Sequence, residues 1–277
     1  GHRPICQDTG IVTIFISVGM DIQWDAELSV EDMLNEGVRL AFNNPDNKLR
    51  ASIMADPAGA RRNTGDNTPA VIHMKIVKGD RVDIQVAAKG GGSEAKSKFV
   101  MLNPSDDIVD WVVKTVPTMG AGWCPPGMLG IGIGGTAEKA MLMAKDSLME
   151  SIDIQELKTR GAKNRVEELR LEIHKRVNEL GIGAQGLGGL TTVLDVKIKD
   201  YPTHAANKPV AMIPNCAATR HAHFILDGSG PSLQTPPDLD DWPKVTWNVG
   251  PSARRVNLDT ITSQEIKEWQ PGETILL

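Results

Sequence analysis

Three cysteines place the strongest constraint on what this chain of 277 residues can fold into and bind. They are Cys6, Cys124 and Cys216, and each lies in a short segment marked by proline or asparagine, of the kind that fixes a side chain near the end of a strand or helix. An odd number of cysteines excludes a complete set of disulfides. Three thiolates could instead hold an iron–sulfur cluster and leave one iron without a protein ligand. The structural alternative is that the thiols are buried as small apolar side chains.

Composition and charge argue against several kinds of partner. The net charge is −5, the pI is about 5.7, and no run of basic residues offers a surface for a nucleic-acid backbone. No apolar stretch approaches the roughly 18 residues needed to span a membrane, and the first residues do not follow the pattern of a secretory signal. Because thiols that bind a cluster need a reducing compartment, we expect the cytoplasm, or the mitochondrion in a eukaryote.

Hydrophobic periodicity predicts a mixture of strands and helices. The predicted strands are residues 11–18, 70–77, 81–88, 191–198, 210–213 and 222–226. The predicted helices begin at Ser29, Ser105, Thr136 and Asn164. The turn Lys78-Gly79-Asp80 predicts that the two strands beside it form a hairpin. The irregular order of the elements favours an α+β fold with mixed or antiparallel strands, and the composition of residues 227–243 predicts a loop or subdomain junction.

Five motifs in this sequence resemble the iron–sulfur (class I) fumarate hydratases. They are Arg3-Pro-Ile-Cys-Gln-Asp-Thr-Gly10, Ala87-Ala-Lys-Gly-Gly-Gly-Ser-Glu94, Gly120-Ala-Gly-Trp-Cys-Pro-Pro-Gly-Met-Leu-Gly130, Asp200-Tyr-Pro-Thr-His-Ala-Ala206 and Asn215-Cys-Ala-Ala-Thr-Arg-His-Ala-His223. The resemblance includes all three cysteines. It implies a domain of mixed α and β structure and a [4Fe-4S] cluster held by Cys6, Cys124 and Cys216. It also implies reversible addition of water to fumarate, giving S-malate.

The residues around the first cysteine suggest how protons are handled. Asp8 lies within roughly 7 Å of Cys6 along an extended chain, close to anything bound at an open iron, and Gln7 would offer a neutral hydrogen bond. The alternative for Asp8 is an Asx turn that ends at Gly10. The resemblance favours a catalytic Asp8, and it implies a second catalytic, substrate-contacting residue at His204.

Two further features suggest how a dicarboxylate is anchored. The triglycine run leaves backbone N–H groups unshielded, which suits an anionic oxygen, although a plain flexible turn is the alternative. The resemblance favours carboxylate contact near Gly90 or Gly91. A guanidinium fits a carboxylate bidentately, and Arg50 is our candidate, with Arg61 and Arg62 left as competitors.

Taken with the resemblance, these residues predict a fumarate hydratase, a hydro-lyase expected to be oxygen-sensitive and homodimeric. The content of residues 120–135 favours fumarate as substrate. The alternatives are a tartrate or methylfumarate dehydratase of the same family, or a non-catalytic iron–sulfur sensor. The resemblance implies that a carboxy-terminal domain supplies further groups to the site. We expect residues 1–277 to be the amino-terminal, cluster-binding domain without that partner domain, although a separately encoded subunit is the alternative.

Overall fold

The structure is a computed structural model that describes residues 8–47, 49–230, 232, 253–257, 259–269 and 275–276. It divides into two compact units, Gly1–Ser232 and Leu233–Leu277. The first unit contains two four-stranded sheets, each with parallel and antiparallel neighbours. The expectation of mixed α and β structure is therefore confirmed. Most of the predicted junction at residues 227–243 lies outside the described residues.

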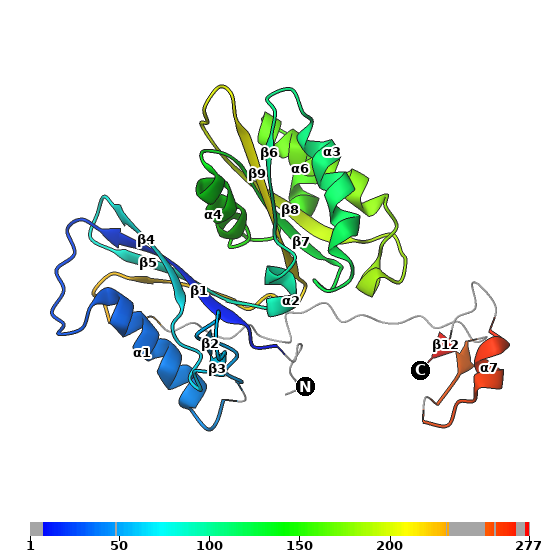
Figure 1. Cartoon of the computed structure of the whole chain (residues 1–277), viewed down its shortest axis with the longest axis horizontal. Helices are drawn as coiled ribbons and strands as arrows, with labels where there is room; N and C mark the ends of the chain where they lie inside the picture. Colours follow the sequence, from blue (N-terminus) through cyan, green and yellow to red (C-terminus); the bar gives the residue numbers. More distant parts are fainter. Residues whose placement is uncertain are drawn as a thin grey trace. The chain divides into compact units, whose positions relative to one another are not determined.

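The first sheet packs one apolar face against a helix. Its strands, in spatial order, are β10 (His221–Leu226), β5 (Val82–Lys89), β1 (Ile11–Gly19) and β4 (Val71–Val77). Alternate residues of β1 and β5 are buried together with Val38 of α1 (Val30–Asn43), which lies along this face (Figure 1). The opposite face carries polar side chains such as Ser17 and Gln85. This two-sided pattern is the alternation that the sequence shows.

The predicted hairpin of β4 and β5 is wrong, because β1 lies between them. Phe15 of β1 pairs with His73 in parallel β4 and with Gln85 in antiparallel β5. The reason is burial: β1 is the most continuously buried strand of this sheet, so the centre is where its side chains are covered. The end of β1 fits inside the β4–β5 connection, where a Cβ added to Gly19 would lie 2.3 Å from the Gly79 carbonyl oxygen.

The second sheet has helices on both faces. Its strands, in spatial order, are β6 (Lys98–Leu102), β9 (Lys208–Cys216), β7 (Gly127–Gly134) and β8 (Val193–Tyr201). Helices α3 (Ile108–Thr115) and α6 (Arg165–Asn178) cover one face, and α4 (Ala137–Ser147) covers the other (Figure 1). A Cβ added to Gly132 would lie 2.0 Å from the Ala140 carbonyl oxygen, so α4 rests directly on the backbone of β7.

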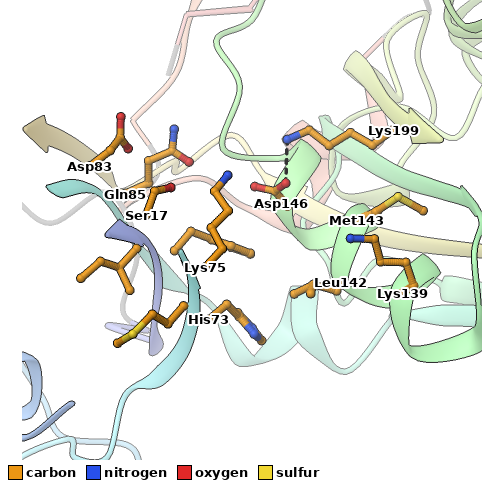
Figure 2. Close-up of a pocket in the computed structure, with 13 residues that line it drawn as sticks. Ser17, His73, Lys75, Asp83, Gln85, Lys139, Leu142, Met143, Asp146 and Lys199 are labelled. Carbon is orange, nitrogen blue, oxygen red and sulfur yellow. Dashed lines mark hydrogen bonds and ion pairs between the residues drawn. The ribbon is translucent and has the colours of Figure 1, made fainter. Parts of the chain in front are cut away.

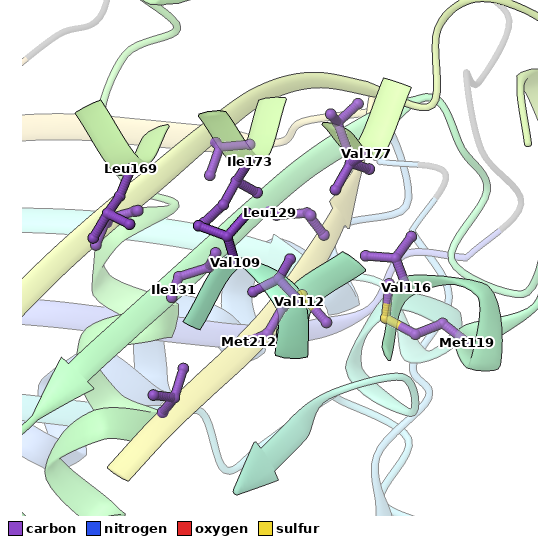
Figure 3. Packing of buried hydrophobic residues seen from close by; sticks show 14 of the residues in the cluster. Val109, Val112, Val116, Met119, Leu129, Ile131, Leu169, Ile173, Val177 and Met212 are labelled. Carbon is purple, nitrogen blue, oxygen red and sulfur yellow. The ribbon is translucent and has the colours of Figure 1, made fainter. Parts of the chain in front are cut away.

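The main core lies between this sheet and the pair α3 and α6. Figure 3 shows Leu129 and Ile131 of β7 among apolar side chains from both helices, including Val112 and Ile173. Full burial of a side chain of this size contributes roughly 1.5–3 kcal/mol, whereas an exposed ion pair contributes about 0–1 kcal/mol. The core therefore outweighs the surface ion pairs in holding the helices on the sheet.

A buried group of charges ties α6 to β8 and to the start of α5 (Ile154–Arg160). The Arg170 guanidinium bonds the Asp153 carboxylate and lies 3.1 Å from Asp195 Oδ1, while Lys197 binds the same two carboxylates. Asp195 is completely buried. Two cations thus face two anions, and each buried charge has a partner.

The remaining elements are short. In the first unit they are β2 (Met54–Ala55), β3 (Arg62–Asn63), α2 (Gly91–Glu94), η1 (Val116–Met119) and η2 (Ala184–Gly186). The second unit contains β11 (Arg254–Arg255), β12 (Ile275–Leu276) and α7 (Ser263–Lys267), which begins with a capping box between Thr262 and Glu265. Across the described residues, the helices are all too short or too polar to cross a membrane.

Candidate functional site

Strand register brings two of the three predicted cluster ligands to one edge of the second sheet, called here the cysteine edge. Gly127, the first residue of β7, pairs with Cys216, the last residue of β9, and Cys124 lies three residues before Gly127. The strands are closely packed there, because a Cβ added to Gly127 would lie 2.2 Å from the Asn215 carbonyl oxygen. Cys124 is exposed, Cys216 is half-buried, and neither forms a disulfide. The chain therefore carries both cysteines at the same edge of the sheet.

The turn that carries Cys124 is held in an unusual conformation. Cys124 has a φ of +56°, in the left-handed region that non-glycine residues rarely adopt. Its N–H donates to the Ala121 carbonyl at 2.9 Å. The glycine-rich loop before β8 packs on the same turn, since the N–H of Gln185 donates to the Pro125 carbonyl at 2.6 Å. The surrounding structure therefore fixes the direction in which the Cys124 side chain leaves the backbone.

The triglycine turn, Gly90–Gly92, connects Asp8 to the cysteine edge. A Cβ added to Gly92 would lie 2.4 Å from the Gly122 carbonyl oxygen, so this turn lies directly against the Cys124 turn. On its other side, the N–H of Gly91 donates to Asp8 Oδ2 at 2.6 Å. Asp8 thus lies beside a turn that touches the turn of a predicted ligand.

The Asp8 carboxylate is oriented by two main-chain donors. Besides the bond from Gly91, Asp8 Oδ1 accepts from the N–H of Gly10 at 2.8 Å, which is the Asx turn that the sequence allows. The two interpretations of Asp8 are compatible, because the turn uses one oxygen and the triglycine contact uses the other. The predicted role of Gly90 and Gly91 towards a substrate carboxylate stays a prediction.

Two cationic side chains converge on this region. Arg220, four residues after Cys216, donates to the main-chain carbonyl of Asp8, and its Nε is buried with no hydrogen-bond partner among the described residues. Lys89, the last residue of β5, is 3% exposed and donates to the Pro214 carbonyl. Burial lowers the pKa of Lys89 to about 7, against the opposing influence of Glu94 and Cys216.

His221 belongs to the same surroundings. It follows Arg220 directly and pairs with Ala87 of β5. Burial, with smaller contributions from Lys89 and Arg220, lowers the pKa of His221 to about 4, so its imidazole is neutral at pH 7. At pH 7 the positive charge of the region is therefore carried by Arg220 and by the protonated fraction of Lys89.

Sequence reasoning did not single out Lys89 or Arg220. Both residues lie inside the quoted motifs. The sequence feature that could have drawn attention to Lys89 is its place at the end of a strand in which every second residue is apolar. Nothing in the sequence indicates that its side chain crosses to a strand of the other sheet. Burial of that kind becomes visible only in three dimensions.

Three other predicted residues, Arg50, Cys6 and Gln7, lie near the first cysteine motif or within it. The hydroxyl of Thr9 bonds the Arg50 carbonyl, and the N–H of Arg50 donates to Thr9 Oγ1 at 3.2 Å, so the Arg50 backbone lies beside the segment that carries Asp8. Cys6 and Gln7 lie outside the described residues. Among the residues that are described, no group of three His, Cys, Asp or Glu side chains is arranged to hold a metal ion.

His204 is not brought to the cysteine edge. It follows the end of β8, where Tyr201 pairs with Gly134, and β7 and β8 run parallel. The eight residues of β7 place roughly 23 Å of strand between this end of the sheet and the cysteine edge. His204 Nδ1 accepts from the Ala206 N–H at 3.2 Å, within its own loop. The catalytic role of His204 stays a prediction, but within one chain its side chain lies far from Cys124 and Cys216.

A cavity of about 520 Å³ lies elsewhere in the first unit, between the polar face of the first sheet and α4. Figure 2 shows His73 and Lys75 of β4 on one side of this space and Lys139 of α4 on the other. Lys199 pairs with Asp146 at 2.8 Å at its margin. The cavity contains none of the predicted site residues, and the cysteine edge is the better candidate.

Known proteins resemble this chain over most of its length. Residues 1–225 match the family described as fumarate hydratase (fumerase). A protein of Methanocaldococcus jannaschii, provisionally named L(+)-tartrate dehydratase subunit alpha, is 35% identical over 223 residues, which cover 79% of this chain and 76% of that protein. The L(+)-tartrate dehydratase subunit alpha of Escherichia coli K12 is 29% identical over 228 residues, covering 81% of this chain and 73% of that protein.

Proposed function

Because this chain belongs to the class I fumarate hydratase family, we propose that it is the cluster-binding part of a hydro-lyase that acts on a small hydroxylated dicarboxylate. The observation that carries the proposal is the convergence of Cys124, Cys216 and Asp8 at one edge, with Arg220 and Lys89 beside them. Two cysteines with a purely structural role would not require two partly or fully buried cations at the same place.

The residues at the cysteine edge fit an iron–sulfur cluster. Thiolates are the usual ligands of such clusters, and a cluster held by three of them is anionic at its protein side. The buried Nε of Arg220, which has no acceptor among the described residues, fits an anionic group there. We propose Cys6, Cys124 and Cys216 as the ligands of a [4Fe-4S] cluster. When bound, the cluster would supply an iron without a protein ligand as a Lewis acid for a substrate oxygen.

The chain's own residues would orient the substrate and handle a proton. Asp8 is held by the N–H groups of Gly10 and Gly91, so its carboxylate is fixed in direction before substrate arrives. We assign proton transfer or water orientation to Asp8, with Gln7 as a neutral hydrogen-bonding neighbour. Positive charge beside the triglycine turn would attract a substrate carboxylate, and Gly90, Gly91 and Arg50 remain our candidates for its anchors.

The relatives favour tartrate over fumarate as the first substrate to test. The two proteins compared above carry the name of L(+)-tartrate dehydratase, which supports the alternative that the sequence left open rather than the reading from residues 120–135. Loss of hydroxide from one central carbon of tartrate and a proton from the other leaves an enol, which tautomerises to a 2-oxo dicarboxylate. The same loss from malate gives fumarate.

We also propose that a second polypeptide completes the site. Both relatives are named as alpha subunits, which favours a separately encoded partner over a fused carboxy-terminal domain. This chain contributes Arg220 and Lys89 near Asp8, and the partner would face them across the substrate. Two copies of each polypeptide would give a dimer of two-subunit enzymes, in place of the homodimer expected from the resemblance.

The proposal is tested by assaying the complete enzyme, meaning this chain with the polypeptide that completes its site, after anaerobic reconstitution. L(+)-tartrate, S-malate and methylmalate are offered separately, with 2-oxo acid formation and the absorbance of the unsaturated acid as readouts. We expect dehydration of L(+)-tartrate to have the highest kcat/KM. A fully loaded enzyme that dehydrates none of the three would refute the hydro-lyase and favour an iron–sulfur sensor.

A further inference from the structure

Lys89 is buried to a degree that ordinary packing does not explain. It ends β5, its side chain is 3% exposed, and lysine is among the residue types least often fully buried. Removing an ammonium group from water is costly unless hydrogen bonds or charges compensate. A buried lysine at this position therefore needs an interaction that offsets its burial.

That interaction joins the two sheets. The Lys89 ammonium donates to the carbonyl of Pro214, which lies on β9 two residues before Cys216. The neighbouring strand β6 begins at Lys98, which pairs with Met212, so it does not accompany β9 to its end. Among the described strands, residues 213–216 are thus flanked by β7 alone, and Lys89 holds them on the side that β6 leaves open.

The backbone of Lys89 also holds the segment that carries Asp8. Lys89 pairs with Ile11 at the start of β1, and a Cβ added to Gly10 would lie 2.3 Å from the Lys89 carbonyl oxygen. One residue therefore contacts the Asp8 segment through its main chain and the Cys216 strand through its side chain. These are the two parts of the candidate site that come from different sheets.

We propose that Lys89 is a positioning residue that fixes Cys216 relative to Asp8 in the cluster site, an inference that rests on the proposed cluster. It acts through the main chain of β9 and not through contact with substrate. Its positive charge adds to that of Arg220, whereas nearby Lys145 is paired with Glu94.

The test compares Lys89→Met, which keeps the aliphatic stem but loses the donor and charge, with Lys89→Arg, which keeps both. Lys199→Met is the control, because it removes a half-buried, ion-paired lysine of the same unit that is remote from the cysteine edge. The first measurement is amide hydrogen exchange of residues 213–219 in the full chain without cluster. We expect faster exchange in Lys89→Met alone, with Lys89→Arg close to wild type.

The second measurement is the rate at which a chelator removes iron from the reconstituted chain. Loss of an interaction that orients a ligand commonly weakens metal binding by 10–100-fold, so Lys89→Met should lose iron about tenfold faster or more. Its cluster should also be harder to reduce, because a positive charge has been removed. Lys89→Arg should restore both properties towards wild type, which a merely space-filling role would not predict.

The outcomes separate this inference from the proposed function. If wild type takes up no cluster, the proposed function fails, and exchange in residues 213–219 still decides whether Lys89 holds Cys216. If wild type binds a cluster and folded Lys89→Met matches it in exchange, iron loss and reduction potential, Lys89 is not a positioning residue. Should Lys89→Met not fold, Lys89→Leu, which also lacks the donor and the charge, is measured by the same criteria and overturns the inference if it matches wild type.

Discussion

Cys124 combines exposure with a backbone fixed in the left-handed region, which is unusual for a residue that only fills space. A buried structural thiol would be expected to lie inside the core instead. The carbonyls of Ala121 and Pro125 both accept main-chain hydrogen bonds, from Cys124 itself and from Gln185 of the loop before β8. The side chain can therefore be changed with little effect on the turn itself.

Replacing Cys124 by serine removes one proposed ligand while keeping nearly the same size. We expect iron content and visible absorbance after anaerobic reconstitution to fall sharply, because an alcohol is a poor ligand for iron–sulfur clusters. Circular dichroism and the thermal unfolding midpoint should stay near wild type. Unchanged iron content would remove Cys124 from the ligand set.

Asp8 provides a test of chemistry apart from cluster assembly. Asp8→Asn keeps the size of the side chain and one acceptor for Gly10 or Gly91 but removes the charge and the titratable proton. We expect kcat of the complete enzyme to fall roughly 100-fold or more, with iron content unchanged. Parallel loss of iron and turnover would instead assign Asp8 to cluster binding, and wild-type turnover with full iron would end its catalytic assignment.

At the scale of elements, the buried charges between α6 and β8 make the free energy of unfolding depend on pH in the acidic range. Burial alone would raise the pKa of Asp153, but hydrogen bonds from Arg170 and Lys197 outweigh it and hold the pKa at about 2. An unfolded aspartate titrates near about 3.9. Because the folded pKa is depressed, the stabilisation is present above about pH 4 and is lost as pH falls towards about 2.

The expected result is a fall in the urea midpoint of the full chain as pH is lowered from about 4 to 2, measured by circular dichroism. Asp153→Asn should reduce stability at pH 7 and flatten this part of the profile, since the titrating group is gone. Asp21→Asn, at an exposed residue after β1, is the control and should leave the profile unchanged. If the urea midpoint falls equally steeply with pH in wild type and in Asp153→Asn, other carboxylates dominate acid unfolding.

The elements also show what can be predicted from sequence and what cannot. Helix starts at Ser29 and Asn164 are confirmed, because each side chain accepts the N–H three residues later and such caps are coded locally. The start predicted at Ser105 is wrong by two residues, because Asp107 is the residue that caps α3. The order of strands in the first sheet was missed, since alternation fixes which face is apolar but not which strand is the neighbour.

The residues of the candidate site also include some that could be predicted from the sequence and some that could not. Asp8, Gly91, Cys124 and Cys216 were identified from motifs, and the structure brings them to neighbouring turns of two sheets. Lys89 was missed because its partner is a main-chain carbonyl 125 residues away, which no spacing rule describes. His204 was identified from its motif as well, yet one strand length separates it from Cys216.

At the scale of the whole molecule, the position of His204 has a consequence for assembly. If both Asp8 and His204 act on one substrate, the two side chains must come from different copies of the chain, because one copy holds them at opposite ends of the second sheet. We expect Asp8→Asn and His204→Asn enzymes to be inactive separately. Mixed assemblies of the two should regain activity, because one of their sites would contain both native residues.

The measurement is turnover after the two inactive enzymes are dissociated and reassembled together, with each reassembled alone as the control. Recovery only in the mixture would support a site shared between copies. No recovery in verified mixed assemblies would contradict it. Full activity of His204→Asn on its own would remove His204 from the catalytic residues.

The close approaches at Gly92 and Gly127 limit how this chain can change during evolution. Both positions face backbone atoms nearer than any Cβ could tolerate, so the innermost wall of the candidate site cannot acquire new side chains without displacing a turn or strand. A lineage that shifts from one dicarboxylate to another would therefore have to accumulate its changes on the opposing polypeptide. This chain would then stay nearly unchanged across the family, while the polypeptides that pair with it diverge and determine which dicarboxylate is bound.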